Sequence, residues 1–481
     1  MFTLDRQGRG TLVDQIYEGV QGLIHVGHWP VGARLPSVRR LASDLDVSIF
    51  TVSSAYSRLV SDGVLFSRVG AGFFVALPKP EILNAEHPGA VQRPDCAANV
   101  VLNAVDLGRY AVPAGSGFLP EDWLEDAIPP AVVGRLMRQE VSISTPVSVM
   151  GLPLLREQIA SRLANIRINA QPTQIVTTCG ATHAFSLVSG MLLGPGDTVV
   201  VEEPGYMMHK AQLVKTGASI VSVPRMADGP DLDMLEAVAK QYRPKALVIQ
   251  PVLHNPTGLT LSPACAYRLL MLAERYGFYV IEDDVFGSLC TERNLRLSSL
   301  DGLSRVFYIS SFTKVLSPAL RVGFVACPPA FCEPIIEAKI LSVQHSSSLQ
   351  ETIVAHVLRS GRYQAHLSAL RGRILRAHSA ARLALSEVGV AFDGPPNDGL
   401  FLWGRLGAQV DIDGLIDAAF RDGIFLLRGT LFSVRGDFER HMRFNIGYSS
   451  DPRLCALLDR FRVGVASESM ATDARARKRQ A

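Results

Sequence analysis

One lysine stands at the end of a short apolar run, in a setting that suits covalent chemistry. The run covers residues 306–309, and Lys314 follows it closely. A lysine that forms a Schiff base must be partly desolvated and must have a lowered pKa. The hydroxyls of Ser311 and Thr313 and the guanidinium of Arg321 would suit the phosphate of an aldehyde cofactor. For these residues taken alone, an ordinary lysine after a strand remains the alternative.

The sequence around Lys314 alternates between apolar, strand-like runs and helical patterns. Near-continuous apolar strands with helices between them predict an α/β fold with a mainly parallel, doubly wound sheet. Ligands bind at the carboxyl ends of such strands, so the residues that follow the runs should lie together. The runs cover residues 175–178, 198–201, 219–223, 246–250, 279–281, 306–309 and 324–326.

Other strand ends supply further groups that such a cofactor needs. A glycine that opens a helix can present backbone N–H groups to a phosphate. An aromatic ring, an amide and a carboxylate follow the later runs. Each is common in turns by itself, but together with the lysine they form the set that pyridoxal phosphate requires of a protein. The set is Gly180, Tyr206, Asn255, Asp283 and Lys314.

The first 78 residues follow a different pattern. Apolar residues at helical spacing predict three helices, and Ser37 and Ser48 are candidate N-caps of the second and third. Two short apolar runs, 64–66 and 72–75, then predict a hairpin. This order is typical of a winged helix-turn-helix. A small all-α interaction domain that binds no DNA remains the alternative.

Composition and charge restrict the remaining possibilities. A chain of 481 residues predicts two or three domains, and a net charge of +3 leaves room only for a local DNA-binding surface. Seven scattered cysteines without a Cys-x-x-Cys pair argue against disulfides and metal sites, and they fit a reducing cytoplasm. We expect no signal peptide and no membrane span, because the amino end lacks an apolar core and no run of eighteen apolar residues occurs.

These patterns predict a division of the chain into four parts. A winged helix-turn-helix covers residues 1–78, and a linker rich in proline and glycine covers 79–115. The sheet-forming domain, with a smaller carboxyl-terminal α/β subdomain, covers 116–465, and a disordered basic tail covers 466–481.

The amino-terminal pattern resembles the DNA-binding domain of the GntR family. The resemblance rests on the segments GARLPSVRRLA (32–42) and VSIFTVSSAY (47–56). In the family an arginine usually follows the Val-Ser pair, whereas Ile49 and Phe50 stand here. These two side chains could touch thymine methyl groups, but they cannot form bidentate hydrogen bonds to guanine. The resemblance implies DNA contacts at Arg34, Ser37, Arg39, Ser48, Thr51, Arg58, Arg68 and Gly70.

Residues 116–465 resemble fold-type I aminotransferases, on the segments GLPLLRE (151–157), NPTG (255–258) and GLFLW (399–403). The resemblance implies that Lys314 forms the Schiff base, that Asp283 pairs with the pyridine nitrogen and that Asn255 binds the phenolic oxygen. It implies further that Tyr206 stacks on the ring and that Arg443 binds the carboxylate of an amino compound. The phosphate would be held by Gly180, Ala181, Thr182, Ser311 and Arg321.

The order of the two domains resembles the MocR subfamily of transcription regulators. That resemblance implies a homodimer on an operator with two half-sites, and a small amino compound as effector. One position departs from the aminotransferase pattern, because Phe286 stands where a tyrosine usually donates to the phenolic oxygen. A working aminotransferase with an accessory DNA-binding domain is the rival reading, and a DNA-binding protein with an empty cofactor pocket is a third.

Overall fold

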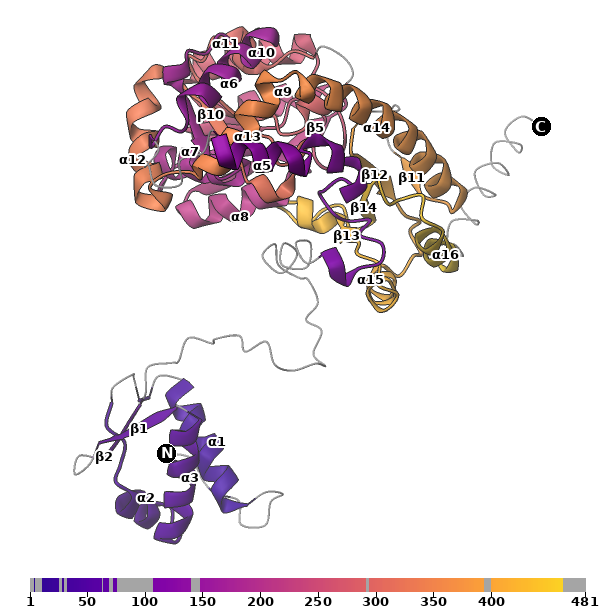
Figure 1. Cartoon of the computed structure of the whole chain (residues 1–481). Coiled ribbons are helices and arrows are strands. Elements are labelled where there is room, and N and C mark those ends of the chain that lie inside the picture. Colours follow the sequence, from indigo (N-terminus) through magenta and orange to yellow (C-terminus); the bar gives the residue numbers. More distant parts are fainter. Residues whose placement is uncertain are drawn as a thin grey trace. The chain divides into compact units, whose positions relative to one another are not determined.

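A computed structural model describes residues 4, 11–25, 28–29, 33–62, 64–68, 72–75, 107–139, 148–290, 294–392 and 399–461. Contacts within the chain divide it into two compact units, Met1–Gln92 and Arg93–Ala481, shown in Figure 1. In the ranges given above, no helix has both the length and the apolar character that crossing a bilayer requires. Each unit is described by itself below.

The smaller unit is a winged helix-turn-helix, as the sequence predicts. The side chain of Ser37 accepts a hydrogen bond from Arg40 N (3.2 Å) at the start of the second helix, and Ser48 accepts one from Thr51 N (3.0 Å) at the start of the third. Apolar residues of all three helices and of the hairpin form one buried cluster, with Tyr56 among its largest side chains. The elements are α1 (Leu12–His25), α2 (Val38–Asp44), α3 (Ile49–Ser61), β1 (Leu65–Arg68) and β2 (Gly72–Val75).

The larger unit is built on an eight-stranded, mainly parallel sheet of order β3-β10-β9-β8-β7-β4-β5-β6. Strands β9, β8, β7, β4 and β5 are parallel, while β10 is antiparallel to both of its neighbours and β6 is antiparallel to β5. The amino end of β10 therefore lies beside the carboxyl ends of β3 and β9. The strands are β3 (Ile175–Thr178), β4 (Thr198–Glu203), β5 (Ser219–Met226), β6 (Gly229–Pro230), β7 (Ala246–Ile249), β8 (Tyr279–Asp283), β9 (Val306–Ser311) and β10 (Gly323–Ala326).

Helices cover both faces of this sheet, because its central strands are apolar on both sides. Val199 joins a core cluster with α7, α8 and α12, whereas the next residue, Val200, joins a cluster with α9, α10 and α11. This arrangement is the doubly wound fold that the sequence predicts. The helices are α7 (Ala181–Leu192), α8 (Met207–Thr216), α9 (Leu232–Tyr242), α10 (Pro263–Tyr276), α11 (Leu297–Asp301) and α12 (Cys332–Val343).

A smaller carboxyl-terminal subdomain contains an antiparallel sheet of order β11-β12-β14-β13. In Figure 1 the long helix α14 leads to this sheet. The chain enters the larger unit beside it, since Val112 pairs with Ile424 and Gly115 N donates to Phe425 O. The remaining elements are α5 (Pro130–Gln139), α6 (Pro153–Asn165), α13 (Ser348–Arg359), α14 (Arg362–Glu387), β11 (Ala391–Phe392), β12 (Phe401–Arg405), α15 (Ile412–Arg421), β13 (Leu427–Arg428), β14 (His441–Asn445) and α16 (Pro452–Arg460).

Candidate functional site

A large cavity of about 1250 Å³ opens at the carboxyl ends of the central strands. Its lining combines residues of the large sheet with residues of the smaller subdomain, and it brings together the side chains that the sequence singles out. Gly180 lies next to this lining, at the start of α7. The lining includes Ala181, Thr182, Tyr206, Asn255, Asp283, Ser311, Lys314, Arg321 and Arg443.

Lys314 projects into this cavity from the turn after β9. Its Nζ donates a hydrogen bond to Gly117 O (2.9 Å) and lies 3.9 Å from the centre of the Phe118 ring. Burial, followed by the positive charges of Arg443 and Arg321, lowers the pKa of Lys314 from 10.5 to about 7. A neutral, nucleophilic amine is therefore accessible near neutral pH.

Asp283, at the end of β8, has one oxygen engaged and one free. Its Oδ2 lies 3.0 Å from His209 Nε2 and accepts a hydrogen bond from Gln250 Nε2 (2.8 Å). Its Oδ1 is buried and has no hydrogen-bond partner among the residues that the structure describes. A buried, unpartnered carboxylate oxygen is costly, and a protonated pyridine nitrogen would satisfy it.

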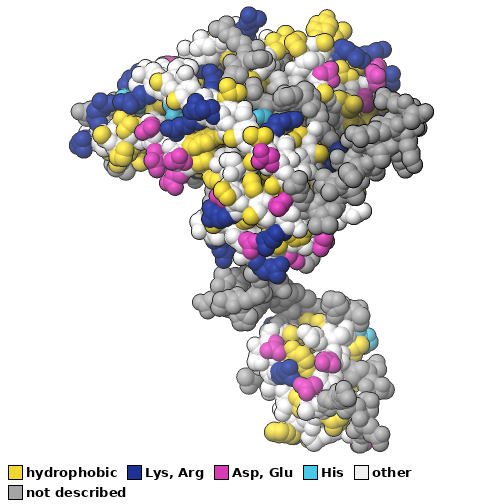
Figure 2. Space-filling view, turned by 90° about the vertical axis from the view of Figure 1, so that its right-hand side faces the viewer, with side chains coloured by type: hydrophobic (Ala, Val, Ile, Leu, Met, Phe, Trp, Pro, Cys, Tyr) yellow, Lys and Arg dark blue, Asp and Glu magenta, His cyan; other side chains and the backbone are white. Residues whose placement is uncertain are grey.

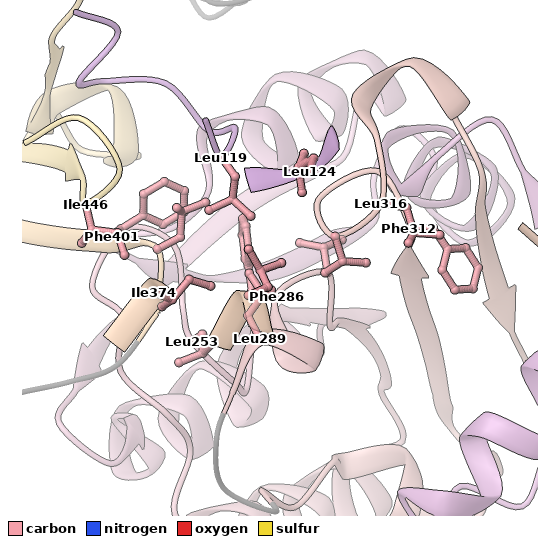
Figure 3. Packing of buried hydrophobic residues seen from close by; sticks show 14 of the residues in the cluster. Leu119, Leu124, Leu253, Phe286, Leu289, Phe312, Leu316, Ile374, Phe401 and Ile446 are labelled. Atoms are coloured by element: carbon pink, nitrogen blue, oxygen red, sulfur yellow. The ribbon is translucent and has the colours of Figure 1, made fainter. Parts of the chain in front are cut away.

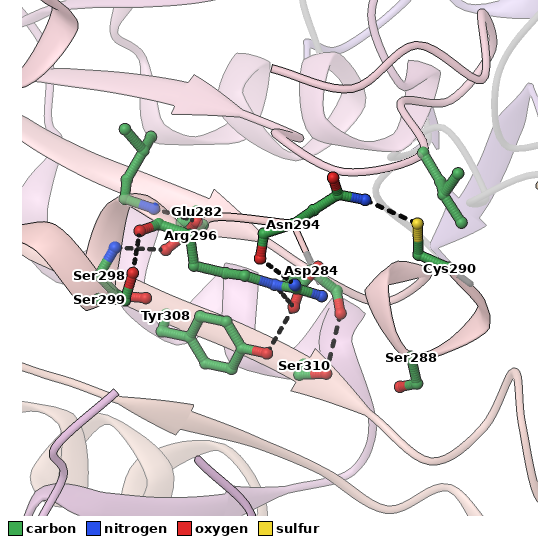
Figure 4. A network of polar contacts seen from close by, with 12 residues as sticks. Glu282, Asp284, Ser288, Cys290, Asn294, Arg296, Ser298, Ser299, Tyr308 and Ser310 are labelled. Atoms are coloured by element: carbon green, nitrogen blue, oxygen red, sulfur yellow. Dashed lines mark hydrogen bonds and ion pairs between the residues drawn. The ribbon is translucent and has the colours of Figure 1, made fainter. Parts of the chain in front are cut away.

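The neighbouring carboxylate, Asp284, has a different task. Figure 4 shows it bound to Arg296 and Tyr308. Arg296 Nε lies 3.0 Å from Asp284 Oδ2, and the Tyr308 hydroxyl donates to the same oxygen (2.6 Å). Of the two adjacent aspartates, only Asp283 lines the cavity. Asp284 therefore ties β8 to β9 and to the turn before α11.

The residues expected to bind a phosphate meet where α7 begins. Gly180 has φ +88°, and no side chain caps the helix. This positive φ favours glycine, and a Cβ atom at Gly180 would lie 2.7 Å from Arg321 Nη2, so it would displace that guanidinium. Arg321 reaches the site because β10 runs antiparallel, and its Nη2 donates to Cys179 O (3.2 Å). The Ser311 hydroxyl, at the end of β9, lines the same cavity and accepts from Thr313 N (3.1 Å). Open backbone N–H groups and a guanidinium form a site for an anion.

Arg443, on β14, is buried without a counter-charge. Its Nη1 donates to Asn255 Oδ1 (3.0 Å), its Nη2 donates to Gly115 O (2.6 Å), and its Nε has no partner. Burial lowers the pKa of Arg443 to about 10. Among the residues that the structure describes, no carboxylate forms an ion pair with it. A small carboxylate in the cavity would supply the missing partner.

Phe286 closes one side of the cavity with an apolar ring. The side chain is only 4% exposed, and Figure 3 shows it among Leu253, Leu289, Leu119 and Phe401. Its ring packs edge-on against Phe401, with 5.3 Å between the ring centres. The lining therefore has a hydrocarbon surface where the aminotransferase pattern would place a hydroxyl.

Two groups of the site were not predicted from the sequence. His209 stacks on Phe185 (4.4 Å between ring centres), and Gln250 joins Asp283 to Asn255, whose N–H donates to Gln250 Oε1 (3.1 Å). His209 stands one helical turn after Tyr206, and this spacing could have indicated a shared face. No motif marks Gln250, which is the residue directly after β7.

A short backbone segment, Gly115–Phe118, runs along the cavity and is held by two of its basic side chains, Arg443 and Lys314. Gly115 O accepts from Arg443, and Gly117 O accepts from Lys314. Asn445 Nδ2 donates to the carbonyls of Ser116 (2.9 Å) and Phe118 (2.7 Å). The part of the chain that enters the larger unit is thus in direct contact with the candidate amine and carboxylate sites.

In the smaller unit, the candidate DNA contacts differ in their availability. Arg34, Arg39 and Arg68 are exposed. Arg58 is exposed as well, but it forms an ion pair with Asp14 (2.7 Å) and lies over a tyrosine ring of α1, so a phosphate would compete with that carboxylate for its guanidinium. Ser37 and Ser48 cap helices, Thr51 shares a hydrogen bond with Ser48, and Gly70 lies outside the described residues.

The face of the larger unit that Figure 2 shows carries charges of both signs. On the face in Figure 2, its Lys and Arg side chains lie interspersed with Asp and Glu. A phosphate backbone is attracted by a patch of one sign. The exposed arginines of the smaller unit are therefore the better candidates for DNA contact.

Comparison with known proteins adds two family matches. Residues 103–461 match the family model described as aminotransferase class I and II, and residues 12–75 match that of bacterial regulatory proteins of the gntR family. The chain is 31% identical over 461 residues to the uncharacterized HTH-type transcriptional regulator YdcR of Escherichia coli (strain K12), a match that covers 90% of this chain and 94% of that protein. It is 29% identical over 381 residues to the probable rhizopine catabolism regulatory protein MocR of Rhizobium meliloti, covering 77% of this chain and 76% of that protein.

Among solved structures, one similar chain is LysN, an α-aminoadipate aminotransferase from Thermus thermophilus complexed with N-(5'-phosphopyridoxyl)-L-leucine. The TM-score is 0.69 at 26% identity, and the match covers 76% of this chain and 94% of LysN. Proteins with this fold use pyridoxal phosphate. The free oxygen of Asp283, the open start of α7 and the neutral amine of Lys314 fit that cofactor.

Proposed function

The chain belongs to the MocR-type transcription regulators, which join a gntR-family helix-turn-helix domain to an aminotransferase class I and II domain, and from this premise we propose that it senses an amino compound through its pyridoxal phosphate site. The effector would carry an amino group and a carboxylate. Its binding would change the affinity of the helix-turn-helix domain for an operator.

One observation carries this proposal, namely that Lys314 and Arg443 share one cavity and one backbone segment. The cofactor, when bound, supplies a carbonyl carbon that takes up amines reversibly and a ring that withdraws electrons. Lys314 is the amine that would hold it, and Asp283 would keep the ring nitrogen protonated. The forked guanidinium of Arg443 would bind the carboxylate of the effector.

The segment Gly115–Phe118 gives this site a route to the rest of the chain. An amino compound would change both contacts. Its carboxylate would take the N–H groups of Arg443, so that Gly115 O would lose the donor that now holds it. Its amine would replace Lys314 on the cofactor, so that the released Lys314 Nζ could donate to Gly117 O. This segment follows the linker in sequence. Its conformations with and without the effector would therefore bias the DNA-binding domain differently.

DNA binding would follow the pattern of helix-turn-helix dimers. We propose a homodimer in which two helix-turn-helix domains bind two half-sites, because linking two weak modules raises their joint affinity through effective concentration. The exposed Arg34, Arg39 and Arg68 would contact phosphates and set the register on the duplex.

The test uses the full-length protein with its cofactor. Lys314→Ala should remove the visible absorption of the lysine-bound cofactor and should abolish the effect of amino compounds on a DNA footprint. Lys245→Ala is the matched control, because Lys245 is partly exposed and pairs with Asp197 outside the cavity. An unchanged spectrum in Lys314→Ala would refute the assignment of this lysine.

A catalytically active aminotransferase is the second candidate, favoured by the likeness to LysN and by the presence of both Lys314 and Asp283. A single-turnover incubation with an amino acid and a keto acid separates the two. Stoichiometric conversion of the cofactor to its amine form, followed by steady turnover, would support the enzyme. A lasting spectral change without turnover, together with an altered DNA footprint, would support the sensor.

A further inference from the structure

The first turn of α3 exposes two large apolar side chains. Ile49 is 56% exposed and Phe50 is 80% exposed, although the buried cluster of the smaller unit takes up Val52, Ala55 and Tyr56 of the same helix. Leaving a phenylalanine in water forgoes the free energy that its burial would give. An exposed pair of this kind, on an element that binds a partner, indicates a contact surface.

The rest of the exposed side of α3 is suited to lie against base edges in a DNA groove. Ser53 and Ser57 follow at helical spacing, and both are exposed and small. The helix, with the sequence IFTVSSAYSRLVS, contains no acidic residue that would repel phosphates. In helix-turn-helix proteins the amino-terminal residues of this helix contact base edges in the major groove.

The one apolar feature that base edges present in the major groove is the C5 methyl group of a pyrimidine. On the basis of the proposed DNA binding, we propose that Ile49 and Phe50 read pyrimidine methyl groups, so that each half-site is recognised through thymine at the positions that these side chains meet. Neither side chain can donate or accept a hydrogen bond, so discrimination here depends on whether the methyl group is present.

Exposed arginines near α3 would fix the position of this apolar contact along the DNA duplex. Arg39 and Arg40 lie exposed on α2, and Arg34 and Arg68 lie exposed on and beside the hairpin. Arg68 is also held over the rings of Phe66 and Phe74, 5.5 Å from each centre. Basic side chains therefore stand on α2 and on the hairpin, two elements that pack against α3, and they suit contacts with the phosphates that border a groove.

The size of the effect follows from the area of one methyl group. Burying one CH₂ or CH₃ group is worth about 0.8 kcal/mol, which corresponds to about a fourfold change in affinity. Removing a contacted methyl group should therefore weaken binding about fourfold at each such position. Placing 5-methylcytosine at the same position restores a methyl group but changes the base pair. This substitution should recover part of the lost affinity only if the protein does not read the base pair itself.

The experiment begins with selection of bound duplexes by the full-length protein loaded with pyridoxal phosphate. Each thymine of the selected site is then replaced by deoxyuridine, which deletes the methyl group and leaves base pairing intact. We expect one to three positions per half-site at which wild-type affinity falls about fourfold. A second series that places cytosine or 5-methylcytosine at these positions distinguishes thymine from a methylated cytosine as the source of the methyl group.

Variants then connect the methyl groups to the two side chains. Phe50→Ala and Ile49→Ala should each bind the thymine site more weakly and should lose discrimination against deoxyuridine at one position. Arg39→Ala should weaken all sequences equally and keep the discrimination. Tyr267→Ala removes another exposed ring, 64% exposed on α10, and should change neither quantity.

Three outcomes would overturn the assignment. Equal affinity of the wild-type protein for thymine and deoxyuridine sites would exclude methyl readout while leaving DNA binding intact. Discrimination that survives in Phe50→Ala and Ile49→Ala would assign it to other residues. A loss of self-association in Phe50→Ala, with unchanged discrimination, would show that the pair contacts a second copy of the chain. Absence of any selected DNA would instead contradict the proposed function.

Discussion

Replacing Lys314 by methionine should stabilise the larger unit of the cofactor-free protein. The lysine lines a cavity beside two arginines, and burial together with their charges lowers its pKa from 10.5 to about 7. In the unfolded chain the amine keeps its ordinary pKa, so the folded protein holds fewer protons between pH 7 and pH 10.5. Folding stability should therefore rise with pH across that window, and the wild-type protein should be weakest relative to the variant at or below pH 7.

The magnitude follows from the two pKa values. Each pKa unit corresponds to about 1.4 kcal/mol, so the cost of Lys314 at pH 7 is at most about 5 kcal/mol, about 3 at pH 8 and about 1 at pH 9.5. The side chain is half-buried because the cavity opens to solvent, and water screens part of this cost. We expect Lys314→Met to gain about 1 to 2 kcal/mol at pH 8 and to lose most of that gain by pH 9.5.

Urea unfolding of the cofactor-free protein, followed by tryptophan fluorescence and circular dichroism, measures the gain at both pH values. Lys339→Met is the matched control, since burial also lowers the pKa of Lys339, to about 8, but Lys339 is fully buried and its Nζ donates to Val149 O (2.5 Å) and Thr177 Oγ1 (3.4 Å). Lys314 Nζ donates to Gly117 O, which borders the open cavity, where water can replace the lost donor. Lys339→Met instead leaves the buried Thr177 hydroxyl and Val149 O without this donor, so it should be less stable than wild type. A Lys314→Met protein that is no more stable than wild type at pH 8, or equally stabilised at both pH values, would refute this account of the lysine.

Further predictions concern the cofactor and effector sites. Gly180→Ala should weaken cofactor binding at least tenfold in an absorbance titration, because its Cβ would displace Arg321, whereas Gly190→Ala, with no atom near its added Cβ, should bind normally. Arg443→Lys should raise the amino acid concentration for half-maximal spectral change by about ten- to a hundredfold, and an amine without a carboxylate should show no such change. Phe286→Tyr should cost the cofactor-free protein about 1 to 3 kcal/mol in urea unfolding and should lower the midpoint of the visible pH titration when the cofactor is bound.

The sequence allowed the central residues of the site to be predicted, because they follow strands whose carboxyl ends share one edge. Lys314 and Asp283 are examples, and the apolar runs before them correspond to β9 and β8. The family resemblance already singled out Asp283 from the two adjacent aspartates, and the structure adds a physical difference, since Asp283 lines the cavity whereas Asp284 pairs with Arg296. His209 escaped prediction because it lies inside a helix rather than at a strand end.

Backbone acceptors left no signal in the sequence at all. The carbonyl groups of Gly115 and Gly117 accept hydrogen bonds from Arg443 and Lys314, yet any residue type has a carbonyl group. For Arg58, by contrast, the sequence did carry a signal, but the structure shows another partner for its side chain. Its position on α3 suggested a DNA contact, but the approach of α1 engages it with Asp14. Pairing between helices that are distant in sequence depends on packing that local periodicity does not specify.

The contacts of Gly115 and Gly117 have a consequence for the operator itself. Coupling between two binding sites is reciprocal, so a segment that lets an amino compound alter DNA affinity must let DNA alter the affinity for that compound by the same factor. Operator DNA would then act as a ligand that tunes the chemical sensitivity of the cavity. Promoters with sites of different strength would set different effector thresholds for the same protein, without any change in its amino acid sequence.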